Sequence, residues 1–222
     1  MGSAIPFPVP LHLTPLNTLF SIIQVFYAFT NRTARATARY VKDALGAADI
    51  VTWQSLMLRP LPGQHILVAN RPEIDFPLAV MPRHLTPCGP VIRPVPGVGE
   101  VDPSLDAWLK RGPTVFISLG TLKMVREAEA VEMAGAVMEL LEAAEGVMEG
   151  LQVLWKLKRR KSEDYGVGVG TRVYGILGRV LEADRVRIVE WVKPQPAAVL
   201  KVGTVVCSVN HGGANSFHDA LT

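Results

Sequence analysis

The second half of the chain alternates between two hydrophobic periods. Four short apolar runs have the length of buried strands, at residues 114–120, 151–157, 185–191 and 204–210. The stretches between and after them predict helices, at 124–144, 171–183, 196–201 and 213–221. Because neighbouring parallel strands need crossover connections, this alternation favours a parallel sheet with helices on both faces, an α/β fold.

The helix at 124–144 is predicted to bury one face. Its apolar positions recur at helical spacing. They are Met124, Ala128, Val131, Ala134, Met138 and Leu141.

The first half of the chain predicts helix over 16–48 and a short strand at 64–70. The apolar run at 15–29 is shorter than the ~20 residues that a membrane span needs, so it predicts a buried or interfacial helix. Weak membrane association stays an alternative. The arginines that follow, Arg32, Arg35 and Arg39, indicate a solvated face.

Prolines and glycines crowd residues 81–113, which argues against helices or central strands there. This segment is the candidate interdomain linker. One short helix, SLDAWLK at 104–110, is expected near its end, with start signals at Pro103 and Ser104.

The composition is that of a globular protein and does not by itself indicate a function. The chain has 222 residues, 49% of them hydrophobic, which suits one large or two small globular domains. A net charge of +3, spread along the chain, does not indicate nucleic-acid binding. Cys88 and Cys207 lack metal-type spacing, so we expect two reduced, partly buried thiols in a reducing compartment, the cytoplasm. No basic region precedes the first apolar run, so a signal peptide is not predicted.

Two turns after predicted strands hold candidate ligand-binding residues. In SLGT, Gly120 lets the backbone approach a ligand, and Thr121 is expected to cap the next helix, whose N-terminus favours an anion. An ordinary helix cap is the alternative. In EWVKPQP, Trp191 at a strand end offers a flat plate for a base or sugar, with a core tryptophan as the alternative.

A third turn, HGGANSFHDAL at 211–221, is the most informative. His211, with Asn215 and Ser216 in the first helical turn, predicts an anion cradle beside free backbone N–H groups. Asp219 lies one turn beyond Asn215 and can accept hydrogen bonds from a ribose diol. The anion-binding turn and the carboxylate of Asp219 together predict a nucleoside diphosphate site. The alternative is an ordinary glycine-rich helix start, with a histidine whose hydrogen bonds are made within the protein.

Two further stretches are weaker candidates. YGVGVGTRVYG at 165–175 has Val173 where a dinucleotide fingerprint needs glycine, and no strand precedes it, so it predicts a flexible loop. The basic run KLKRRK at 156–161 predicts a solvated loop.

These motifs together resemble the UDP-glycosyltransferases of glycosyltransferase family 1, most of all the fungal branch. The likeness covers nearly the whole chain and rests on the combination of pieces. They are IPFPVPLHLTPLN, RPEIDFP, LTPCGPVI, LDAWL, TVFISLGT, QVLWKL, Trp191 with Gln195, and HGGANSFHDAL.

The resemblance implies a GT-B-like pair of Rossmann-like domains. Residues 1–92 would be the end of the acceptor-binding domain, 93–113 the linker, and 114–222 an incomplete UDP-sugar donor domain. It implies a fragment lacking the N-terminal part and the extreme C-terminus.

The family's motif also implies roles for single residues. Trp191 would stack on uracil, Gln195 would lie near the base and ribose, and Asp219 would take the ribose hydroxyls. Those that would hold the diphosphate are Thr121, His211, Gly213, Asn215 and Ser216. Asp219 stands where the family usually has Glu, and the spacing from Trp191 to Gln195 is one residue longer than W-x-P-Q.

The expected activity is transfer of a hexose, glucose in the first place, from a UDP-sugar to a hydroxyl of a small lipophilic acceptor. Inversion and independence from metals and cofactors are expected with it. The catalytic base is not identified: His12 superficially matches the family's early histidine loop, and a plain loop histidine is the stronger interpretation. Alternatives are a UDP-binding module, one subunit of a split enzyme that needs a partner chain, and a non-functional remnant.

Overall fold

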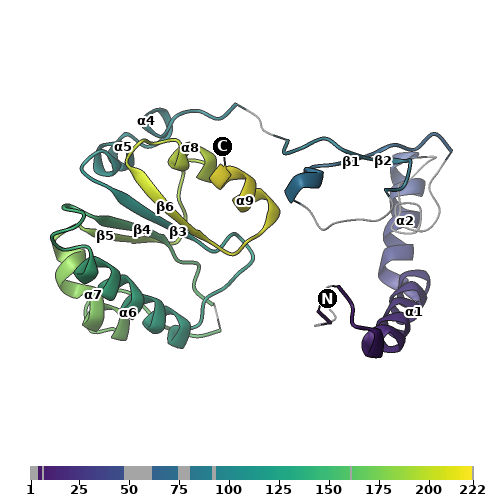
Figure 1. The fold of residues 1–222 in the computed structure, drawn as a ribbon, viewed down its shortest axis with the longest axis horizontal. Coiled ribbons are helices and arrows are strands. Elements are labelled where there is room, and N and C mark those ends of the chain that lie inside the picture. The colour runs from purple at the N-terminus through teal and green to yellow at the C-terminus, as the bar shows by residue number, and fades with distance from the viewer. Residues whose placement is uncertain are drawn as a thin grey trace. The chain divides into compact units, whose positions relative to one another are not determined.

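The computed structural model describes residues 5–6, 8–47, 62–74, 81–91, 94–160 and 162–221 (Figure 1). The chain divides into two compact units. The first comprises residues 1–68 and 76–87, and the second comprises residues 69–75 and 88–222.

The first unit contains two consecutive helices where one helical stretch was predicted. Helix α1 (Thr14–Thr30) follows a short 3-10 turn, η1 (Leu11–Leu13), and α2 (Arg32–Leu45) begins after Asn31. Asn31 has extended backbone, and its side-chain oxygen accepts a hydrogen bond from Ala34 N–H at 3.0 Å. This N-cap explains why the helix breaks there. The predicted strand is present as β1 (Ile66–Val68), which pairs in parallel with β2 (Leu85–Pro87).

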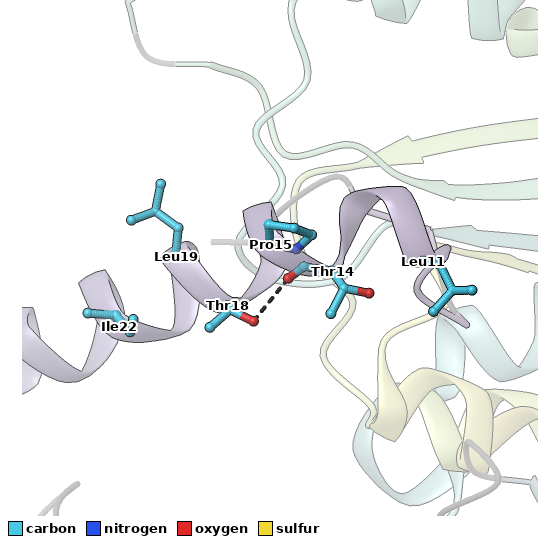
Figure 2. Close-up of a pocket in the computed structure, with 6 residues that line it drawn as sticks. All are labelled: Leu11, Thr14, Pro15, Thr18, Leu19 and Ile22. Atoms are coloured by element: carbon cyan, nitrogen blue, oxygen red, sulfur yellow. Dashed lines mark hydrogen bonds between the residues drawn. The ribbon is translucent and has the colours of Figure 1, made fainter.

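Helix α1 buries none of its residues. Of the two predicted alternatives the buried helix is therefore wrong, and the interfacial helix stays a prediction. The turn before it extends the helical stretch to 20 residues, Leu11–Thr30. By length and composition alone this stretch could cross a membrane, which corrects the expectation that it is too short. Core helices of soluble proteins pass the same test. Figure 2 shows a shallow hollow on this helical stretch, lined by Leu11, Thr14, Pro15, Thr18, Leu19 and Ile22.

The second unit is built on a four-stranded sheet in the order β5-β4-β3-β6, and every pair is parallel. The prediction of a parallel α/β sheet is therefore confirmed. Its strands are β3 (Thr114–Ser118), β4 (Gln152–Lys156), β5 (Val186–Val189) and β6 (Val205–Asn210).

Helices cover both faces of this sheet (Figure 1). One face carries α6 (Glu127–Ala143) and α7 (Arg172–Glu182). The other carries α4 (Val98–Val101), α5 (Pro103–Leu109) and α8 (Pro196–Leu200). Helix α9 (Ala214–Leu221) follows β6. Side chains alternate along the strands, so Val153 and Trp155 face α6 and α7 while Leu154 faces α5.

One face of α6 is buried, as predicted, except near its start. Val131 and Met138 pack against the core that contains Ala134 and Leu141. Met124 and Ala128 are exposed, because Met124 precedes the helix, which begins at Glu127, and Ala128 lies in its first turn. The fully buried residues of the helix are Ala130, Ala134, Val137 and Leu141.

The proline-rich stretch 81–113 contains more structure than predicted, namely β2, α4 and α5. Pro103 sits in the first turn of α5, where its missing N–H costs nothing, and Asp102 rather than Ser104 is the cap, accepting from Leu105 N–H at 3.0 Å. Trp108 and Leu109 are fully buried against the sheet. The proposed boundary at 92/93 lies outside the described residues, and the domain limits stay a prediction.

Both cysteines are free, as expected, but Cys88 and Cys207 are exposed rather than partly buried. Arg32, Arg35 and Arg39 are exposed along α2, as predicted.

Candidate functional site

The strand order of the second unit indicates where a ligand would bind to its sheet. From β3, the first strand of this sheet along the chain, β4 and β5 are added on one side and β6 on the other. The strand order therefore reverses between β3 and β6. In open parallel sheets, ligands bind beyond the carboxyl ends of the strands at such a switch point. Gly120 follows β3 and His211 follows β6, so the two predicted turns meet at this place.

The His211 ring lies between Gly120 and Gly213. A Cβ on Gly120 would be 2.7 Å from the ring's Cε1, and one on Gly213 would be 2.4 Å from its Nε2. Neither position can hold a side chain while the ring stays there. The structure thus brings together these three residues, with His211 itself exposed to solvent.

The turn between β6 and α9 leaves backbone donors at the start of the helix. The Asn210 side chain accepts from Gly212 N–H at 2.9 Å, which fixes the turn and occupies that donor. The first helical hydrogen bond runs from Phe217 N–H to the Gly213 carbonyl at 2.9 Å. The N–H groups of residues 214–216 precede it and have no partner within the helix, so they suit an anion.

Ser216 and Asp219 lie on the side of α9 that faces the sheet. They line a small pocket with Ser118 and Asn210. Its volume of about 10 Å³ is roughly the space of one water molecule. Burial raises the pKa of Asp219, and His218 and Lys201 oppose this shift. Asn215, in contrast, is exposed.

Trp191 is 59% exposed, so the alternative of a core tryptophan is excluded. The ammonium of Lys156 lies 3.9 Å from the centre of its ring. Gln195 is exposed and precedes α8 without a side-chain capping bond. Trp191 follows β5 and His211 follows β6, at the two sides of the sheet, three strand spacings or roughly 14 Å apart at the strand ends.

Thr121 does not cap the next helix, which corrects that expectation. Helix α6 begins six residues later, at Glu127. Its start is satisfied by Glu129, whose carboxylate accepts from Arg126 N–H at 2.8 Å. Thr121 is exposed beside Gly120, and its carbonyl accepts from Lys158 Nζ at 2.6 Å.

The sequence missed two residues near this site. Lys156 comes from the run expected to be a solvated loop, yet it is buried at the end of β4. His218 is also buried, and its Nε2 lies 3.2 Å from Oδ1 of Asn70. The position of Lys156 directly after an apolar run was a usable signal, whereas nothing in the sequence links Asn70 to His218.

Other expectations concern residues away from this turn. The glycine-rich stretch before α7 is a loop, as predicted, and Thr171 caps the helix that follows. His12 lies exposed in η1 of the first unit. Within the described ranges, no group of three or more His, Cys, Asp or Glu side chains could hold a metal ion.

Comparison with known proteins adds one clear relative. No family model matches the chain. Glycosyltransferase sdnJ from Sordaria araneosa is 41% identical over 155 residues, which cover 69% of this chain and 29% of that protein. The chain is homologous to a fungal glycosyltransferase. This confirms the resemblance that the motifs indicated, and the chain spans less than a third of the length of this glycosyltransferase.

Two solved structures share a weaker likeness. Os79 from O. sativa in complex with U2F and trichothecene has a TM-score of 0.39 and 22% identity, covering 54% of this chain and 23% of that one. Os79 T291V in complex with UDP has a TM-score of 0.38 and 21% identity, covering 52% and 22%. Both TM-scores are below 0.5.

Proposed function

We propose that the chain carries the donor-binding part of a UDP-sugar-dependent glycosyltransferase. The observation that carries the proposal is the His211 ring held between Gly120 and Gly213 at the switch point of the sheet. The homology to a glycosyltransferase supports it.

Donor binding would follow from the geometry of the strand ends. The diphosphate would lie at the N-terminus of α9, where free N–H groups and the side chains of His211, Asn215 and Ser216 supply donors. Uracil would stack on the open face of Trp191, with Gln195 nearby. Asp219 would accept from the ribose hydroxyls, and Gly120, Thr121 and Gly213 would let the backbone approach. These donors would stabilise the leaving diphosphate without a metal ion.

The transferred group would be a hexose, with glucose as the first candidate. It would pass to a hydroxyl of a small lipophilic acceptor, with inversion at the sugar's anomeric carbon. A general base would remove the hydroxyl proton as oxygen attacks and UDP leaves.

Calorimetry with UDP tests the donor site. We expect UDP to bind, and His211→Ala to weaken binding by about 1–3 kcal/mol, the scale of a lost charge-assisted hydrogen bond. His65→Ala, an exposed histidine of the first unit, is the matched control and should leave the affinity unchanged. Folded protein that gives no heat at millimolar UDP would contradict the proposal.

A further inference from the structure

Lys156 is the last residue of β4 and the most deeply buried charge described at this edge of the sheet. Its relative exposure is 7%. Its ammonium lies over the exposed indole of Trp191, 3.9 Å from the ring centre. The attraction of a cation to an aromatic face offsets part of the cost of burial.

The buried ammonium has no anionic partner in the part of the chain that the structure describes. No carboxylate oxygen there lies within 4.0 Å of its Nζ. Burial lowers the pKa of Lys156, and the positive charge of Lys158 lowers it further. A buried cation without a counter-charge is costly, because it has lost water and gained no ion pair.

The position of Lys156 links the two halves of the candidate site. In the sheet register it lies beside Ser118 of β3, which lies beside Asn210 of β6. Residues paired in this way point to the same face of the sheet. Lys156 therefore stands between Trp191 and the turn that carries His211. Lys158 adds a second positive charge at the neighbouring turn, through its bond to the Thr121 carbonyl.

We propose that Lys156 binds the anionic diphosphate of the nucleotide donor, as the counter-charge that this buried ammonium lacks. The inference rests on the proposed function, because it adds a residue to the same donor site. A cation at this place would attract the diphosphate, while the free face of Trp191 would receive the base.

The experiment compares UDP with uridine, which has the base and ribose but no phosphate. Dissociation constants are measured by calorimetry for the wild type, Lys156→Met and Lys156→Arg. Lys110→Met is the control, since it removes one exposed lysine charge directly after α5. We expect Lys156→Met to weaken UDP by about tenfold or more, Lys156→Arg to retain most of the affinity, and Lys110→Met to change nothing. Uridine binding should stay within about twofold in every variant, because uridine lacks the charges that Lys156 would contact.

The outcomes separate the alternatives. Equal weakening of UDP and uridine would overturn the proposal and show that Lys156 acts by holding Trp191. Unchanged UDP binding in Lys156→Met would overturn it while leaving the proposed function intact. Absence of UDP binding in the folded wild type would overturn both. Replacing an unpaired buried cation with an apolar chain should not lower the melting temperature; if Lys156→Met does not fold, Lys156→Gln provides the same comparison.

Discussion

Gly120 and His211 are in direct contact across the ends of β3 and β6. The backbone of Gly120 has φ +82°, and the imidazole of His211 fills the space that a side chain there would occupy. Two features therefore disfavour a side chain at position 120: the left-handed backbone and the His211 ring beside it. Their effects can be separated by experiment.

Gly120→Ala should lose both stability and UDP affinity. The left-handed backbone costs alanine about 1–2 kcal/mol, and the new methyl group displaces the His211 ring. Gly170→Ala is the matched control, because Gly170 has φ +85° and nothing within 4 Å of the added carbon. Urea unfolding should show a similar backbone penalty in both, and calorimetry should show weaker UDP binding only in Gly120→Ala. Equal UDP affinities in the two variants would contradict the placement of His211 in the site.

Trp191→Ala should weaken both UDP and uridine. Stacking of a base on an aromatic ring contributes about 1–3 kcal/mol, and uridine keeps the base. Trp191→Phe should retain part of the affinity, because phenylalanine keeps a flat face. Calorimetric titration of both ligands checks this, and uridine affinity unchanged in Trp191→Ala would place the base elsewhere.

Glu129 should make stability depend on pH in the acid range. Its pKa falls from 4.5 to about 2, first because of the hydrogen bond from Arg126 N–H and then because of Lys123. A lowered carboxyl pKa stabilises the fold above the unfolded value, and the contribution is lost as the pH falls from about 4.5 to about 2.

Glu129→Gln should therefore flatten the stability profile in that window, as followed by thermal unfolding at several pH values. Glu132→Gln, an exposed carboxylate on the same helix, should retain the wild-type slope. A slope that Glu129→Gln leaves unaltered would show that the acid transition has another source.

Two buried tryptophans should respond differently to the same change. Trp108 Nε1 donates to the Asp184 carbonyl at 2.9 Å, and the Arg187 guanidinium lies 4.9 Å from its ring centre. Trp155 is equally buried, but its Nε1 has no hydrogen-bond partner within the described residues. Trp108→Phe should cost about 1 kcal/mol more than Trp155→Phe, because only the former removes a hydrogen bond. Denaturant unfolding measures the difference, and equal losses would argue against the Trp108 hydrogen bond.

The sheet was readable from the sequence because four apolar runs alternate with helical patterns, and a parallel arrangement leaves few other topologies. The details that failed depend on tertiary context. The proline-rich segment was expected to lack structure, yet Trp108 and Leu109 gain enough burial against the sheet to hold α5 in place. The buried face of α6 was predicted correctly from Val131 onward, but Met124 and Ala128 were wrong, because the first turn of the helix could not be located from apolar spacing alone.

The candidate site was only partly readable for a related reason. The turn at His211 could be recognised from the sequence, because two glycines stand there beside side chains that can donate hydrogen bonds. For Lys156 the one usable signal was its position directly after an apolar run, because a lysine at the start of a basic run otherwise resembles any solvated charge. Its ammonium lies against Trp191, which follows a different strand, and this contact cannot be seen in the sequence.

The contact between Asn70 and His218 bears on where a self-sufficient folding unit begins. A shortened chain starting at the expected linker, residue 93, would retain His218 but lose Asn70, which precedes the proline-rich segment. The buried imidazole would then lack that partner, at a cost of about 1–3 kcal/mol. The helix that carries Asp219 and Ser216 would be the element loosened. Residues 69–75, although distant in sequence, thus belong to the part of the protein that proposed donor binding requires.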